Sequence, residues 1–477
     1  MDAQRGIARR MMIGLPPDGT TPAWEKDFSA YPPAGVSVFR RDFADLAELR
    51  ELTRRLRNLA RPRRIFVAID EEGGFVSQLA GHLDVPPNAL LLARGAEAGD
   101  VERAARVTGE RLRSLGIDWV FAPVADIHSR PENPVIGPRA FGTGAAEVSG
   151  HVGECLRGFR AAGVASCLKH FPGHGDTTLD SHHALPRCEA TRSELEKREL
   201  VPFRDHLDAD AVMTTHVVFP ALDPESPATF SRPVVHQLLR EQLGFEGIAI
   251  TDALEMKGAA AGRSPLDQAR LALEAGCDLL LFAFHSEELR RTRLELARLL
   301  ADGDLDRASF DAARPRLAAL DHRIREPAEA ELERPIAALT PDDWEPWLEG
   351  IAQRGLRIGG RLPSVSGPWR VSEPPFDAGP TLRADLEIAG IPVSEETPVV
   401  ELVAIMTRLP LPGEEIERLR SVARERPLVL VGLQNDAWLE GVPEAVLRVA
   451  ATDATRITRR VVARVLAASR SEVVSRG

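Results

Sequence analysis

The sequence predicts an α/β protein built as a (β/α)8 TIM barrel followed by a smaller C-terminal α/β domain. Eight short apolar runs rich in β-branched residues recur over roughly 300 residues, with amphipathic helical patterns between them. After residue 325 the composition changes, and further strand and helix patterns follow. Alternating strands and helices favour a parallel sheet, and eight such units favour a barrel over an open doubly wound sheet, which stays possible.

Each predicted barrel strand is a short apolar run that ends at glycine, proline or polar residues, as buried parallel strands do. The eight predicted strands are residues 7–15, 35–39, 65–70, 117–126, 164–170, 211–217, 247–252 and 277–284.

Two of the helical patterns carry a recognisable start signal. Residues 42–61 repeat apolar side chains on one helical face, and Asp42 is placed to cap that helix. Thr191 and Glu194 form a capping-box pattern ahead of a second helix. Its apolar residues are Leu200, Phe203 and Leu207.

The change of composition predicts the domain boundaries. Residues 326–345 are rich in Pro, Glu and Asp and are typical of a linker or connecting helix. Beyond them, residues 399–407 and 427–434 resemble buried strands, and a helical pattern lies near 454–468. We therefore predict a barrel over 1–325, a linker over 326–345 and a small α/β domain over 346–477.

Polar side chains stand where several predicted barrel strands end. Barrel enzymes assemble their sites from the loops at the carboxyl ends of the strands, so these side chains should meet at one mouth. They are Asp70, Asp126, Lys169, His170, His216 and Asp252.

Composition and charge exclude several classes of protein. The formal net charge of -11 argues against nucleic acid as a partner, since phosphate backbones are bound by clustered positive charge. The four cysteines show no CxxC spacing, which indicates reduced thiols and a cytoplasmic protein. No run of about 18 apolar residues predicts a membrane span, and the first residues do not read as a signal peptide.

The stretch KHFPGHGDTTLDSHH, residues 169–183, admits three interpretations. Its histidines and aspartates are good zinc ligands, but their spacing matches no HExxH-type pattern, and two glycines favour a flexible loop. A polar surface loop is the plainest interpretation. The third is a catalytic loop, in which Asp180 orients the imidazole of His182 so that the ring serves as a general acid and base. The candidate metal ligands are His170, His174, Asp176, His182 and His183.

Three further residues have both a plain and a catalytic interpretation. Asp252 caps the next helix, or it attacks a sugar carbon as a nucleophile, and the two roles are compatible. Asp70 closes a strand-end turn or accepts hydrogen bonds from sugar hydroxyls. Arg139 forms a loop salt bridge or donates to the sugar.

Three motifs together resemble the family 3 glycoside hydrolases of the β-N-acetylglucosaminidase type. They are KHFPGHGDTTLDSHHALP, DIHSRPENPVIGPRAFG and GIAITDALEM, and the resemblance covers about residues 5–325. It implies that Asp252 is the nucleophile, that His182 is the general acid and base, and that Asp180 is the partner of His182. It also implies a mobile catalytic loop that needs no metal. The substrate-binding residues are then Asp70, Gln78, Arg139, Lys169, His170, His216 and Met256.

The chain departs from the family pattern next to Asp70. Where the family reads D-x-E-G-G-R-V-x-R, this sequence places Phe75 and Gln78 at the two arginine positions. The second arginine helps to hold the sugar, so Gln78 weakens a charge-assisted contact. We expect weaker or altered recognition of the non-reducing sugar.

These observations predict a retaining exo-β-N-acetylglucosaminidase that acts on small N-acetylglucosamine-containing saccharides or muropeptides. No metal or organic cofactor and no nucleic-acid or membrane partner is expected, and the chain is expected to be a monomer or a homodimer. The alternatives are a phosphorylase that yields a sugar 1-phosphate, a weakened sugar-binding or sensor protein on the same barrel, and a metal-dependent hydrolase.

Overall fold

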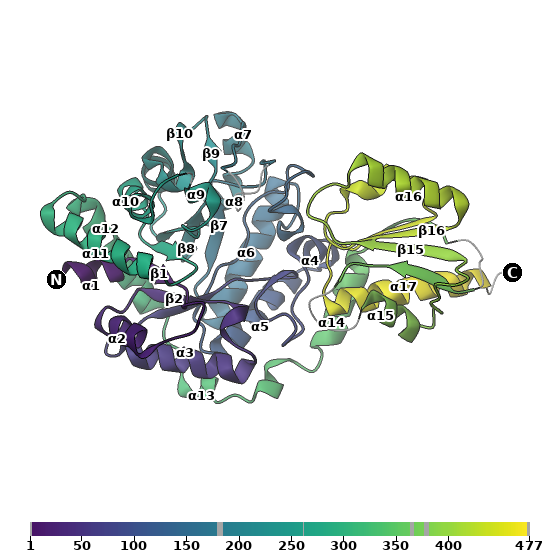
Figure 1. Cartoon of the computed structure of the whole chain (residues 1–477), viewed down its shortest axis with the longest axis horizontal. Helices are drawn as coiled ribbons and strands as arrows, with labels where there is room; N and C mark the ends of the chain where they lie inside the picture. The colour runs from purple at the N-terminus through teal and green to yellow at the C-terminus, as the bar shows by residue number, and fades with distance from the viewer. Residues whose placement is uncertain (1, 179–184, 261, 363–366, 376–380, 475–477) are drawn as a thin grey trace. The chain divides into compact units, whose positions relative to one another are not determined.

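The computed structural model describes residues 2–178, 185–260, 262–362, 367–375 and 381–474 of the chain. The chain divides into two compact units of mixed α/β structure (Figure 1). The first unit comprises Met1–Glu72, Val101–Ser129 and Thr143–Leu339, and the second comprises Gly73–Asp100, Arg130–Gly142 and Thr340–Gly477.

Parallel strands form the core of the first unit. A five-stranded sheet has the order β12-β1-β2-β3-β6, and a three-stranded sheet has the order β11-β8-β7. Isolated parallel bridges pair Trp119 with Ala165 and Ile250 with Leu279, at the facing edges of the two sheets. The strands are β1 Met11–Ile13, β2 Gly35–Val38, β3 Phe66–Ile69, β6 Trp119–Val120, β7 Cys167–Phe171, β8 Ala211–Thr214, β11 Ile248–Thr251 and β12 Leu280–Phe282.

All eight predicted strands overlap an observed one, and each observed strand is shorter than its predicted range. The largest error lies at the start of the chain, where residues predicted as strand begin in helix α1 (Ala3–Ala8). The Asp2 side chain caps this helix by accepting a hydrogen bond from the Gln4 backbone N–H. The capped helix therefore includes Ile7 and Ala8, the first two residues of the predicted strand.

Alternate residues of these strands point into one apolar cluster. The Trp119 ring packs edge-on against Phe66 and Phe121, with ring centroids 5.4 and 6.0 Å apart. Met213 and Ile250 join the same cluster from the three-stranded sheet. Strands of both sheets thus share a single core, which helix α12 (Arg307–Arg323) also enters.

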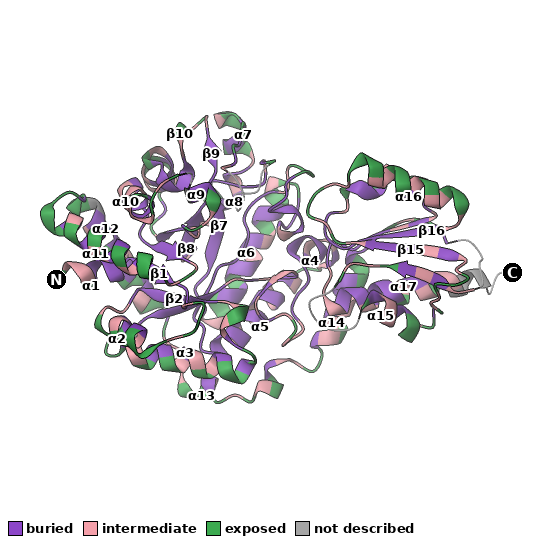
Figure 2. Cartoon of the chain, in the orientation of Figure 1, coloured by how far each residue is buried: buried purple, intermediate pink, exposed green. Residues whose placement is uncertain are grey.

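Helices and short strands surround this core, and Figure 2 shows buried strands beneath helices whose outer faces are exposed. None of the helices within the described ranges is both long and apolar enough to cross a membrane. The remaining helices of the first unit are α2 Pro22–Ala30, α3 Leu46–Ala60, α5 Asp100–Ser114, α6 Ala145–Ala162, α7 Arg192–Lys197, α8 Val201–Asp205, the π-helix η4 Pro233–Gln242, α9 Lys257–Ala260, α10 Pro265–Ala275, α11 Glu287–Asp302 and α13 Glu329–Leu332. The short strands of the first unit are β9 Val218–Phe219 and β10 Asp223–Pro227, whereas β4 Glu71–Gly73 crosses into the second unit and pairs there with β5 Val76–Ser77.

The two predicted helix starts have different outcomes. The capping box of Thr191 and Glu194 is confirmed at the start of α7. Helix α3 begins later than predicted, because Asp45 caps it by accepting a hydrogen bond from the Glu48 N–H. Asp42 instead accepts from the Phe39 N–H and closes a short turn ahead of the helix.

The second unit is a five-stranded sheet with helices on both faces. Its order is β13-β17-β16-β15-β14, and only the β13–β17 pair is antiparallel. Alternate residues of β15 and β16 pack on the two sides, one side against Leu419 of α16 and the other against Leu466 of α17 (Figure 1). The elements are α4 Ala89–Gly95, α14 Trp344–Gly355, β13 Arg357–Gly360, β14 Trp369–Ser372, α15 Leu382–Ile388, β15 Val400–Ile405, α16 Gly413–Glu425, β16 Leu428–Gly432, β17 Leu447–Ala450 and α17 Arg456–Val474.

Two segments assigned to the barrel from the sequence belong to the second unit. They are residues 73–100 and 130–142. Leu91 of α4 lies in the core of the second unit, and a side chain at Gly95 would meet the Ile351 carbonyl of α14 at 2.0 Å. Helix α4 packs closely on α14, so residues 73–100 belong to the second unit, although the chain before and after them belongs to the first.

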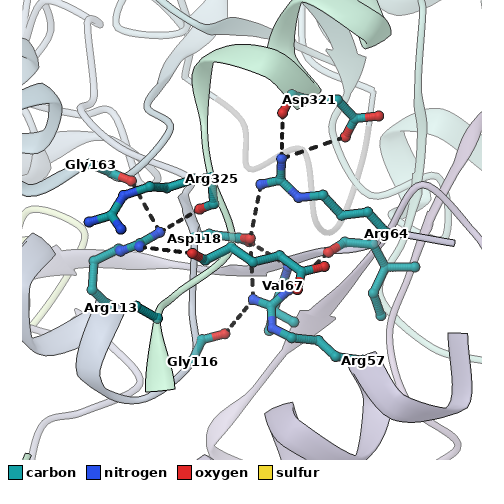
Figure 3. A network of polar contacts seen from close by, with 12 residues as sticks. Arg57, Arg64, Val67, Arg113, Gly116, Asp118, Gly163, Asp321 and Arg325 are labelled. Atoms are coloured by element: carbon teal, nitrogen blue, oxygen red, sulfur yellow. Dashed lines mark hydrogen bonds and ion pairs between the residues drawn. The ribbon is translucent and has the colours of Figure 1, made fainter. Parts of the chain in front are cut away.

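A buried carboxylate anchors the amino end of β6. Asp118 has no exposed side-chain surface and accepts a hydrogen bond of 2.8 Å from the Val67 N–H of the neighbouring strand. Its other oxygen lies 3.2 Å from the Arg57 guanidinium and 3.4 Å from that of Arg64 (Figure 3). Arg57 also donates to the Gly116 and Ile65 carbonyls, so the buried charges are paired and the two terminal nitrogens of this guanidinium are hydrogen-bonded.

The same arrangement, an aspartate that accepts a backbone hydrogen bond and pairs with arginine, recurs before two other strands. Asp210 precedes β8 and accepts from the Ser166 N–H, and Asp278 precedes β12 and accepts from the Ala249 N–H. Helix α12 supplies an arginine to each, through the ion pairs Arg323–Asp210 and Arg316–Asp278. These contacts fix the amino ends of the strands, opposite the ends that carry the predicted site.

Replacing Asp118 tests whether this network stabilises the first unit. We expect Asp118→Ala to lower the free energy of unfolding by about 3–5 kcal/mol, because two arginines then lose their carboxylate in a buried place. Denaturant unfolding measures the change. The control is Glu295→Ala, which removes an exposed pair with Arg298 and should change stability by less than about 0.5 kcal/mol. Equal effects of the two variants would contradict the prediction.

Candidate active site

Lys169 of β7 brings together two carboxylates that follow β3. Its ammonium lies 2.7 Å from Asp70 Oδ1 and 2.6 Å from Glu72 Oε1. The lysine side chain is only 2% exposed, whereas that of Asp70 is 26% exposed. A buried ammonium needs carboxylate partners, because its charge is otherwise costly to remove from water. The ion pair with Lys169 also holds the more accessible Asp70 carboxylate in place. The predicted neighbours Asp70 and Lys169 therefore meet, and Glu72 is a partner that sequence analysis missed.

Asp126 organises the loop that follows β7. Its Oδ2 lies 2.7 Å from His170 Nδ1, and its two oxygens accept hydrogen bonds from the His170 backbone N–H at 3.1 and 3.2 Å. Oδ1 also accepts from the His174 N–H at 2.6 Å. A carboxylate that receives several donors is held in the ionised form. Asp126 was recognised at a strand end but given no site role, because nothing in the local pattern shows which loop it holds.

The pKa of Asp126 reflects these contacts. Complete burial by itself favours the neutral acid, but the facing His170 and His174 and their hydrogen bonds outweigh it. The pKa of the carboxyl group consequently lies below its usual value. The ionised carboxylate in turn orients the His170 ring.

Two glycines explain how the loop fits. A side chain at Gly175 would come within 1.6 Å of the Ile127 carbonyl oxygen, so only glycine allows this close approach. Gly173 has a φ of +132°, which also favours glycine. The loop continues through Thr177, whose hydroxyl lies 3.0 Å from His174 Nδ1. Asp180 and His182, the predicted acid and base pair, lie outside the described residues.

Asp252 directly follows β11. Its N–H donates to the Thr214 carbonyl of β8, and its Oδ1 accepts from the Ala253 N–H at 2.7 Å. No helix begins at Ala253, because a turn leads to the four-residue helix α9 (Lys257–Ala260). The predicted helix cap is therefore wrong, and the half-buried carboxylate closes a tight turn instead.

The charges of this site act on a shared neighbour, Cys167. Burial raises the pKa of its thiol, the Lys169 ammonium opposes this, and the carboxylates of Asp70 and Asp252 add to the increase. The carboxylate of Asp210, which precedes β8, raises the same pKa, so charges at both ends of the strands influence this thiol. All four cysteines of the chain are free and buried.

His216, which is predicted to contact the substrate, lies beside the turn that carries Asp252. Its ring is buried, with Nε2 3.0 Å from the Ala253 carbonyl and Nδ1 3.0 Å from the Thr229 hydroxyl. It stacks on Phe230 with centroids 6.2 Å apart. A ring enclosed in this way supports the turn that carries Asp252 and has no surface for a sugar.

The other predicted residues lie in different places. Met256 is half-buried in the turn after Asp252. Gln78 and Arg139 belong to the second unit. There the Arg139 guanidinium donates to the Val135 carbonyl at 3.1 Å. Phe75, at the first of the two departures from the family pattern, lies under the Arg408 guanidinium at 5.9 Å.

Within the described part of the chain, no three His, Cys, Asp or Glu side chains are grouped so that they could hold a metal ion. The histidines of the loop that are described make other contacts, since His170 faces Asp126 and His174 faces Thr177. His182 and His183, two of the candidate ligands, lie outside these residues.

Carboxylates at the strand ends of an α/β fold are typical of glycoside hydrolases. The model of the glycosyl hydrolase family 3 N-terminal domain matches residues 23–320, more than half of the chain. The chain belongs to glycosyl hydrolase family 3. This finding confirms the resemblance that the three motifs indicate.

Similar proteins support the same family. A β-hexosaminidase A from Pseudoalteromonas piscicida is 32% identical over 67% of the chain, and the match spans 57% of the relative's own length. A β-hexosaminidase from Chromobacterium violaceum is 38% identical over 53% of the chain and 72% of its own length. The solved structure of a family 3 β-N-acetylglucosaminidase from Paenibacillus sp. str. FPU-7 aligns with a TM-score of 0.87 at 29% identity, covering 98% of this chain and 96% of that one.

The lowered pKa of Asp126 predicts a specific acid sensitivity. We expect Asp126→Asn to lower the free energy of unfolding by about 2–4 kcal/mol at pH 5, because charge-assisted hydrogen bonds are lost. The folded-state pKa lies below the unfolded one, so this stabilisation is present above the unfolded value of about 3.9 and is lost as the pH falls through the folded value.

Urea unfolding of both proteins at several pH values between 5 and 3 tests this prediction. The difference in unfolding free energy should shrink as the pH falls. A difference that stays constant or grows over this range would mean that Asp126 is not held ionised by its loop.

Proposed function

We propose that the protein is a retaining exo-β-N-acetylglucosaminidase that removes terminal N-acetylglucosamine from small saccharides. The observation that carries the proposal is the placement of the Lys169–Asp70 ion pair, 2.7 Å long, and of the Asp252 turn at the carboxyl ends of the strands β7, β3 and β11. Family membership and the names of the similar proteins support the choice of sugar.

In the proposed reaction, the Asp252 carboxylate attacks the anomeric carbon while His182 donates a proton to the departing oxygen. The bond from the anomeric carbon to the leaving group breaks, and an ester to Asp252 forms. Water then attacks the same carbon, His182 takes its proton, and Asp252 leaves as a carboxylate. Asp180 holds the tautomer of His182 through both steps.

In this proposal, residues within the described ranges bind the sugar. The Asp70 carboxylate, fixed and charge-balanced by Lys169, accepts hydrogen bonds from sugar hydroxyls. His170, oriented by Asp126, presents its second ring nitrogen to the sugar. His216 supports the Asp252 turn from behind, and Gln78, Arg139 and Met256 remain proposed sugar contacts.

The proposal extends to the fold. We infer that the two parallel sheets of the first unit form one closed eight-stranded barrel, supported by the bridges Trp119–Ala165 and Ile250–Leu279 and by the shared core. The catalytic residues would then stand at its carboxyl-end mouth. A muropeptide-type substrate, a role in peptidoglycan recycling, a cytoplasmic location and action without a cofactor belong to the same proposal.

The decisive experiment is turnover of an aryl N-acetyl-β-glucosaminide compared with the plain β-glucoside. We expect wild type to prefer the N-acetylated substrate and Asp252→Asn to lose about a thousandfold or more in kcat, because the nucleophile is lost. The matched control is Asp208→Asn, an exposed aspartate paired with Arg160, which should leave kcat within about twofold.

Further readouts test the nucleophile and separate the alternatives. A 5-fluoro-N-acetylglucosaminyl fluoride should label Asp252, which mass spectrometry of peptides detects. Added phosphate that diverts the product to the sugar 1-phosphate would favour phosphorolysis. Binding of N-acetylglucosamine without turnover would favour the sugar-binding alternative, and equal turnover by Asp252→Asn would contradict the assigned nucleophile.

A further inference from the structure

Two phenylalanine rings hold an arginine between them in the first unit. The Arg41 guanidinium carbon lies 4.2 Å from the ring centroid of Phe39 and 4.1 Å from that of Phe284. Arg41 also donates a hydrogen bond of 2.7 Å to the Ala283 carbonyl. Stacking and hydrogen bonding together immobilise the arginine and fix the position of the Phe284 ring.

This stack lies at the carboxyl ends of the strands. Phe39 directly follows β2, and Phe284 is the second residue after β12. Strand β1 pairs in parallel with both β12 and β2, so the two strand ends flank the end of β1. A side chain at Gly14, just after β1, would lie 2.0 Å from the Ala283 carbonyl oxygen, so the loop rests directly against this end.

Glu255 ties the stack to the turn that carries Asp252. Its two carboxylate oxygens accept hydrogen bonds of 3.0 Å from the N–H groups of Ala283 and Phe284. Glu255 stands three residues after Asp252 in the same turn. The position of the Phe284 ring is therefore coupled to the proposed nucleophile through a short chain of fixed contacts.

The Phe284 ring is unusually accessible for its size. The residue is 43% exposed, and among the described residues of the first unit it is the one large hydrophobic residue recorded as exposed. A single exposed apolar residue is ordinary on a protein surface. Phe284 differs because the stacking on Arg41, the Arg41–Ala283 hydrogen bond and the Glu255 hydrogen bonds hold it at the rim where the substrate would enter.

We propose that Phe284 is the platform for the leaving-group sugar of the substrate. The apolar face of a pyranose packs on an aromatic ring, and a ring already immobilised loses little entropy on binding. Phe284 is thus a specificity-determining residue, and Arg41 and Glu255 are positioning residues. This inference rests on the proposed function and adds to it the residue that recognises the leaving-group sugar.

Two substrates with and without a leaving-group ring test the proposal. They are the β-1,4-linked N-acetylglucosamine disaccharide and N-acetyl-β-glucosaminyl fluoride. We expect Phe284→Ala to lower kcat/KM for the disaccharide about 3- to 10-fold, because the stacking contact is lost. For the fluoride the change should stay within about twofold. Phe284→Trp, which keeps an aromatic face, should retain most of the disaccharide activity.

The control is Ile388→Ala, which truncates a residue that is 82% exposed in the second unit and should change neither rate. Phe284→Leu keeps apolar volume without a π face and replaces the alanine variant if that protein fails to fold. A variant that lowers both rates equally, or neither, would overturn the platform while leaving the proposed function intact. Failure of wild type to turn over either substrate would instead refute the proposed function.

Discussion

The candidate site depends on one buried carboxylate. Asp126 receives the backbone N–H groups of His170 and His174 and faces the His170 ring, so a single group sets both the path of the loop after β7 and the orientation of an imidazole. Lys169, the residue before His170, is thereby held where Asp70 and Glu72 can pair with it. A loop with two glycines would otherwise have many conformations, and fixing it requires strong, directional contacts.

The two ends of the strands in the first unit use charge in different ways. At the amino ends, Asp118, Asp210 and Asp278 are paired with arginines and with backbone N–H groups, so their charges are satisfied within the protein. At the carboxyl ends, Asp70 and Asp252 keep partly exposed carboxylates. Aspartates thus stabilise the amino ends of the strands, where arginines and backbone N–H groups pair with them. At the carboxyl ends, partial exposure leaves aspartates available for the proposed chemistry.

The rim of the first unit combines polar and aromatic contacts. The Asp252 turn is supported by His216, which contacts the Ala253 carbonyl, and is linked through Glu255 to the loop that carries Phe284. Such support matters for the nucleophile proposed at Asp252, because small displacements of a reacting group reduce the rate strongly. In that proposal, packing around the turn contributes to function without touching the substrate.

The sequence by itself determined the local structure and the kinds of residue at the strand ends. Apolar runs located the eight parallel strands described in the core of the first unit, and three motifs together indicated the family. The remaining features of the site depend on contacts between residues that are far apart in the sequence. Asp70 and Lys169 are 99 residues apart, and Asp126 and His170 are 44 apart, so local patterns could name candidates but could not assign partners.

Only the tertiary structure showed that His216 is enclosed and that residues 73–100 belong to the second unit. Burial and long-range packing decide these features, and neither leaves a periodic signal in the sequence. A strand repeats every two residues and a helix every 3.6, whereas the contacts that complete a site join chain segments with no shared period.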